Sequence, residues 1–173
     1  MPHHFCFQLS EIKRSQAAIG LALFFLLGLL LGVWFSLCAS DALVSPMRAV
    51  VSGRVSIIGL LSSLALPLLF SAFAVYIGRP LLLIPIAFCK AFSFSFLGCG
   101  LLTAWNSAGW LITCLTLFPT GCSLPVLCRY WLGQIFRPGF RLPPLLLSLA
   151  ALAVIGIANY YLILPFLAVI ITF

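Results

Sequence analysis

Five long apolar runs divide this chain, and they constrain its fold more than any other feature. The runs cover residues 17–39, 55–77, 81–105, 110–128 and 145–173. A helix needs about 20 apolar residues to cross the hydrocarbon core of a bilayer. Because 64% of the 173 residues are hydrophobic, the chain has too few polar residues to cover the surface of a water-soluble protein. The pattern predicts an all-α polytopic transmembrane bundle of about five spans with proline-broken helices. It would form a single membrane domain, 17–173, behind a short polar cytoplasmic head, 1–16.

The basic residues predict the orientation of this bundle. Nine Lys and Arg oppose two acids, which leaves a formal charge of +7. The segments expected inside hold Lys13, Arg14, Arg79, Arg129, Arg137 and Arg141, whereas those expected outside hold Arg48 and Arg54. Since basic flanks stay in the cytoplasm, we expect a multi-pass protein with its N-terminus inside and its C-terminus outside. The sequence also allows an additional short re-entrant segment.

Lys90 stands near the middle of the third run, where a cation costs roughly 3 kcal/mol or more unless it is paired or solvated. The two acids, Glu11 and Asp41, flank the first run and lie at another depth. The counter-charge would therefore come from water, a lipid, another protein, the Asn159 amide, or carbonyls freed by Pro67 or Pro119. We predict a polar or partner-binding site formed by Lys90, Asn159, Ser93 and Ser95. The alternative is that Lys90 snorkels and only packs.

Small and basic residues predict two further surfaces. Glycines at helix-packing positions let neighbouring backbones approach closely, and the candidates are Gly28, Gly32 and Gly98. Arg129, Arg137 and Arg141, with Tyr130 and Trp131, predict a basic aromatic belt at the inner interface, where lipid headgroups bind. Pro119, Gly121 and Pro125 predict that the fourth run unwinds or splits into two half-helices.

Several classes of function lack their signatures. There is no H-E-x-x-H, G-x-S-x-G or Walker motif, and the seven cysteines show no C-x-x-C pair. We therefore expect that the chain is not an enzyme and holds no cofactor or metal, and that its cysteines are reduced. The basic residues lack the dense stripe that nucleic-acid binding requires. The predicted partners are the lipid bilayer and other membrane proteins, or copies of this chain.

Three short segments resemble a known family. They are Ser71-Ala-Phe-Ala-Val-Tyr-Ile-Gly-Arg-Pro80, Cys89-Lys-Ala-Phe-Ser-Phe-Ser-Phe96 and Leu117-Phe-Pro119. Over roughly residues 20–137 this arrangement resembles the stage II sporulation protein M family, although Ala91 and Ser95 stand where the family pattern has glycines. The resemblance implies a bacterial plasma-membrane protein of sporulation that anchors or recruits peptidoglycan-remodelling partners.

Three functions follow as hypotheses from these features. The leading one is a non-enzymatic scaffold acting through protein interaction, in line with the resemblance and the missing catalytic motifs. The second is a small permease, or the membrane subunit of a transporter, with a mid-membrane anion-binding site at Lys90. The third is a lipid-interacting or flippase-like protein that uses Arg129, Arg137 and Arg141 at the inner headgroups.

Overall fold

The computed structural model describes residues 3–38, 56–104, 109–136, 141–163 and Pro165. Within these ranges every element is helical, and none is a strand. The long helices are α1 (His3–Cys38), α3 (Ile57–Tyr76), α4 (Leu83–Ala104), α5 (Gly109–Phe136) and α6 (Leu142–Ala158). A short 3-10 turn, η1 (Pro80–Leu82), precedes α4, and a π-helical segment, η3 (Asn159–Ile163), follows α6.

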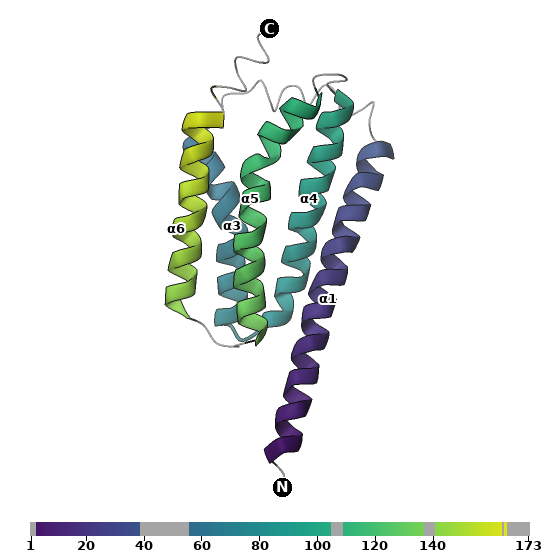
Figure 1. Cartoon of the computed structure of the whole chain (residues 1–173), viewed down its shortest axis with the longest axis vertical. Coiled ribbons are helices and arrows are strands. Elements are labelled where there is room, and N and C mark those ends of the chain that lie inside the picture. The colour runs from purple at the N-terminus through teal and green to yellow at the C-terminus, as the bar shows by residue number, and fades with distance from the viewer. Residues whose placement is uncertain (1–2, 39–55, 105–108, 137–140, 164, 166–173) are drawn as a thin grey trace.

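The long helices form one antiparallel bundle (Figure 1). α3 and α5 run against α1, α4 and α6, so the end of α3 meets the start of α4, and the end of α5 meets the start of α6. We call this the basic end, because it carries Arg79, Arg129 and Arg141. α1 lies at the edge of the bundle along α4, and its first turns extend past the basic end.

The sequence-predicted fold class is confirmed: the described chain is an all-α bundle. Five of its helical segments are long and apolar enough to cross a membrane: Ser15–Cys38, Ile57–Tyr76, Leu83–Thr103, Trp110–Phe136 and Leu142–Ile163. Large apolar side chains such as Leu30, Trp34 and Val154 are exposed on their outer faces. Such faces are stable against lipid chains, so the chain is a multi-pass membrane protein.

The core lies where α3, α4, α5 and α6 meet. Leu68, Ala87, Leu127 and Trp131 are fully buried there, with Leu83 and Leu152 beside them. Gly78 makes the turn between α3 and η1 with a φ of 70°, a left-handed conformation that favours glycine. This tight turn places α4 directly beside the end of α3.

The fourth helix differs from its prediction. α5 is one continuous helix that contains both Pro119 and Pro125 and ends at Phe136, not near residue 128. Prolines are tolerated inside membrane helices because neighbouring helices and side chains satisfy the backbone groups that they free. As a result Tyr130 and Trp131, expected at the interface, are buried in the bundle.

Candidate functional site

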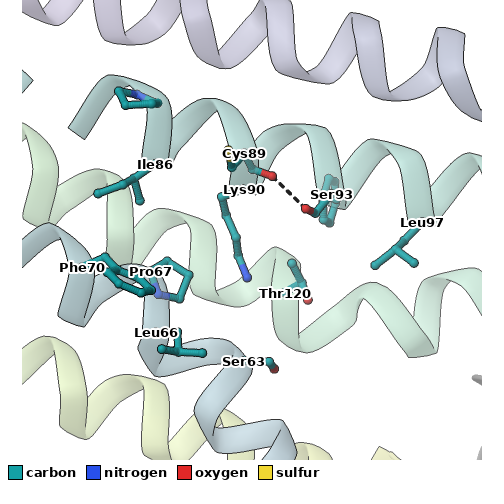
Figure 2. A pocket seen from close by; sticks show the side chains of 12 residues that line it. Ser63, Leu66, Pro67, Phe70, Ile86, Cys89, Lys90, Ser93, Leu97 and Thr120 are labelled. Atoms are coloured by element: carbon teal, nitrogen blue, oxygen red, sulfur yellow. Dashed lines mark hydrogen bonds between the residues drawn. The ribbon is translucent and has the colours of Figure 1, made fainter. Parts of the chain in front are cut away.

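Lys90 belongs to the middle part of the membrane span, not to a helix end. It is the eighth residue of α4, whose apolar stretch runs from Leu83 to Thr103. At a rise of 1.5 Å per residue, its Cα lies only about 5 Å along the axis from the centre of that stretch. Figure 2 shows its side chain directed away from α4 into the space between α3 and α5.

The Lys90 side chain lines a cavity of about 600 Å³, which we call the Lys90 groove. α3 contributes Ser63, Leu66, Pro67 and Phe70, α5 contributes Thr120, and α4 contributes Pro85, Ile86, Cys89, Lys90, Ser93, Phe94 and Leu97. Several of these residues, including Leu66, Phe70 and Leu97, are exposed on the outside of the bundle. The groove therefore opens sideways, toward the lipid.

The polar groups of the groove are mostly occupied within their own helices. The Ser63 hydroxyl donates to the Leu60 carbonyl at 2.8 Å, and the Ser93 hydroxyl donates to the Cys89 carbonyl at 2.8 Å (Figure 2). Lys90 makes no hydrogen bond or ion pair within the described chain, and no residue that lines the groove is acidic. The groove thus presents one uncompensated ammonium group among apolar walls.

Pro67 adds an acceptor to the same groove. Proline has no N–H, so the carbonyl of Ser63, four residues earlier, lacks its usual helical donor. Both Ser63 and Pro67 line the groove opposite Lys90. Of the carbonyl sources considered from the sequence, Pro67 is thus at the groove, whereas Pro119 is not among the lining residues.

The structure separates the other predicted members of the site. Ser93 lies in the groove with Lys90, but Ser95 is on the face of α4 that packs on α1, where a Cβ on Gly32 would collide with its hydroxyl. Asn159 is buried in η3 and does not line the groove. α6 packs mainly on α3 and α5, so its residues do not reach the Lys90 face of α4.

The three predicted packing glycines all lie at helix contacts. A Cβ on Gly28 would stand 2.6 Å from the Phe88 carbonyl oxygen, and one on Gly32 would stand 2.5 Å from that of Phe92. Both contacts join α1 to α4. Gly98 faces α5, where a Cβ would lie 2.9 Å from the Leu117 Cδ1.

One buried polar link was not predicted. The Trp131 indole nitrogen donates to the Ser71 hydroxyl oxygen at 2.8 Å, and that hydroxyl donates to the Pro67 carbonyl at 2.6 Å. Trp131 and Ser71 are both fully buried. The link ties α5 to the proline turn of α3, just behind the Lys90 groove. A serine four residues after a mid-span proline was the only signal available in the sequence.

Two of the predicted inner-interface arginines meet at a second cavity. Arg129 of α5 and Arg141, the residue before α6, line a space of about 470 Å³ at the basic end. Tyr130, Gln134 and Ser148 line the same space. Arg137 lies outside the described residues.

No metal site is formed in the described part of the chain, where no group of three or more His, Cys, Asp or Glu residues comes together. Comparison of the chain with protein-family models, with curated proteins and with solved structures finds no match. The chemistry of the Lys90 groove must therefore be argued from its own residues.

Proposed function

We propose that the chain is a non-enzymatic membrane scaffold that holds a partner protein through the Lys90 groove. In this proposal, an acidic side chain of a partner transmembrane helix pairs with the Lys90 ammonium. The single observation that carries the proposal is a mid-span cation in a laterally open groove, with no acid among the described residues that line it. Since an intramembrane cation is costly alone, a carboxylate brought by a partner would stabilise the assembled state.

The lining favours one carboxylate over a free, mobile anion. A dehydrated anion needs several donors, but the Ser63 and Ser93 hydroxyls already donate to carbonyls of their own helices. The ammonium of Lys90 is left as the main donor, and a single carboxylate oxygen pair suits it. The apolar side chains of Leu66, Phe70 and Leu97 supply packing surface for a helix on either side of that contact.

The resemblance to the stage II sporulation protein M family suggests the kind of partner. It supports a partner that remodels peptidoglycan, or a membrane protein attached to such an enzyme, in a bacterial plasma membrane. The scaffold would contribute no reacting group, in keeping with the missing catalytic motifs of the sequence.

Affinity capture of the tagged full chain from its host membrane, under mild detergent, tests the proposal. We expect recovery of a membrane partner with an acidic residue in a span, reduced about tenfold or more by Lys90→Met and partly retained by Lys90→Arg. Removal of one member of a buried charge pair costs several kcal/mol. Exchange of both charges, with Lys90→Glu in this chain and Lys in place of the partner's acid, should restore recovery.

Two controls keep this experiment decisive. Arg79→Ala removes a cation at the basic end, outside the groove, and should leave recovery unchanged. Without its partner, Lys90→Met should unfold no more easily than the wild type in detergent, because the change removes a costly cation. Equal recovery with wild type and Lys90→Met would overturn the proposal.

The volume of the groove favours a second candidate, a small permease. Small-molecule sites measure about 300–1,000 Å³, and the Lys90 groove, at about 600 Å³, falls within that range. Uptake of chloride or phosphate into liposomes would then depend on Lys90. Equal fluxes through wild type and Lys90→Ala would exclude Lys90 from transport.

A further inference from the structure

The cavity at the basic end has the composition of a binding site for an anion. Its lining combines two guanidinium groups, from Arg129 and Arg141, with the polar side chains of Tyr130, Gln134 and Ser148. None of the described residues that line it is acidic. Neither arginine forms a hydrogen bond or an ion pair with any other described residue. A guanidinium presents a planar fork of donors that matches a phosphate group.

Two buried polar groups in the same cavity lack partners. Tyr130 and Gln134 are each only 3% exposed. The Tyr130 hydroxyl and the Gln134 Oε1 have no hydrogen-bond partner among the described residues. An unsatisfied buried polar group is costly and calls for a bound ligand or water. Both atoms are closed off from solvent in the bundle. A turn of each side chain toward the cavity that it lines would let the hydroxyl donate to a phosphate oxygen and the amide oxygen accept from a hydroxyl group of the ligand.

The rest of the lining is apolar and extends into the membrane span. Val126 lies two turns deeper in α5 than Gln134, and Ala151 lies deeper in α6 than Pro144 and Leu147. The other polar lining residues lie closer to the helix ends than these two, so the apolar Val126 and Ala151 form the deepest part of the cavity. A phospholipid likewise has a charged headgroup followed by an apolar acyl chain, whereas free phosphate has no apolar part that could contact the apolar lining. Basic pockets between membrane helices at the cytoplasmic side are known to bind anionic lipid headgroups.

We infer that this cavity binds an anionic phospholipid whose phosphodiester carries a hydroxyl-bearing headgroup, of the phosphatidylglycerol type. Arg129 and Arg141 contact the phosphate, Tyr130 donates to it, and Gln134 accepts from the headgroup hydroxyl. The acyl chain lies along the faces of α5 and α6. The site is separate from the Lys90 groove and does not depend on a protein partner.

Native mass spectrometry of the full chain in detergent, titrated with phosphatidylglycerol, tests this inference. We expect one tightly bound lipid, and affinity about fivefold weaker in Arg129→Ala and in Arg141→Ala, as for the loss of one basic contact at an anionic headgroup. Tyr130→Phe should weaken binding by a similar factor, because it removes one buried hydrogen bond. Arg79→Ala is the matched control, since Arg79 is exposed at the same end but outside the cavity, and it should bind as the wild type does.

The titration has further arms that distinguish the possible sources of phosphate. Phosphatidylcholine should bind more weakly, and millimolar inorganic phosphate should not displace phosphatidylglycerol. Displacement by inorganic phosphate would overturn the lipid assignment. Equal losses in Arg79→Ala and Arg129→Ala, or unchanged binding in Tyr130→Phe, would overturn the cavity as the site. If Arg129→Ala does not fold, Arg141→Ala carries the test, because Arg141 is exposed ahead of α6.

Discussion

Trp131 shows how a single side chain can be placed by one hydrogen bond. Its indole group is amphipathic, and such rings are enriched at membrane interfaces. In this bundle the indole N–H finds its acceptor in the Ser71 hydroxyl of α3, at 2.8 Å, and the whole side chain is buried. Because its indole N–H is hydrogen-bonded inside the protein, Trp131 can lie in the bundle and not at the membrane interface.

Loss of this contact should destabilise the bundle. Ser71→Ala leaves the buried Trp131 donor without an acceptor, and we expect a loss of about 1–3 kcal/mol. A double-mutant cycle with Trp131→Phe should give a coupling energy of about 0.5–1.5 kcal/mol. Unfolding in mixed micelles, followed by circular dichroism, measures both quantities.

Ser62→Ala is the matched control for this cycle. The Ser62 hydroxyl is exposed and donates only to the Gly59 carbonyl of its own helix, so its removal should change stability little. Additive effects of Ser71→Ala and Trp131→Phe would show that the hydrogen bond contributes nothing to stability.

The residues of the Lys90 groove could be predicted from the sequence only in part. The depth of Lys90 along its run identified the cation and the neighbouring Ser93, because spacing along one helix is regular. Which helices stand beside that face depends on tertiary packing, which no run of hydrophobic residues encodes. The sequence therefore predicted Asn159 and Ser95 as members of the site. In the structure α6, which precedes Asn159, packs mainly on α3 and α5, and Ser95 faces α1.

At the scale of the helices, the contact between α1 and α4 depends on the absence of side chains. Gly28 and Gly32 lie one turn apart on α1. At each of them the α4 backbone lies so close that an added Cβ would collide with it. Close backbone approach of this kind gains van der Waals contact, the main source of helix association in lipid.

Addition of one methyl group at these glycines should therefore separate the helices. We expect Gly28→Ala and Gly32→Ala each to lower stability by about 1–3 kcal/mol, because the colliding atoms include backbone carbonyl oxygens that cannot rotate away. The measurement is again unfolding in micelles. Gly20→Ala, with nothing within 4 Å of its added Cβ, should be neutral or slightly stabilising. Equal stability of all three variants would contradict this account of the contact.

The existence of the membrane helices was well predicted, and their ends less so. Apolar runs of about 20 residues leave few alternatives to a spanning helix. The end of α5 at Phe136 was missed because Arg129 was read as the start of the inner interface. A long arginine side chain tolerates a position inside a helix end, since its head can reach polar surroundings.

For the whole molecule, the charges divide the bundle into two ends. Arg79, Arg129 and Arg141 belong to the basic end, and Lys13 and Arg14 belong to the first half of α1, whose first turns extend past that end (Figure 1). Positive charge near short loops sets the orientation of a multi-pass protein. The basic end should therefore face the cytoplasm.

Reporter fusions test this orientation directly. Alkaline phosphatase is active only outside the cytoplasm, so we expect it to be inactive when fused after Arg79 and active when fused after Ile163. Green fluorescent protein at the same two positions should give the opposite pattern. Phosphatase activity at Arg79 would invert the topology and would place the proposed lipid site in the outer leaflet.

The position of α1 at the edge of the bundle has a consequence for biogenesis. α1 is synthesised before its main packing partner, α4, which ends at Ala104, more than 60 residues after α1 ends at Cys38. Ribosomes add about 5–20 residues per second. The face of α1 that carries Gly28 and Gly32 is therefore without its partner for several seconds before α4 has been synthesised. During that interval it is open to the insertion machinery, to chaperones or to α1 of another nascent chain.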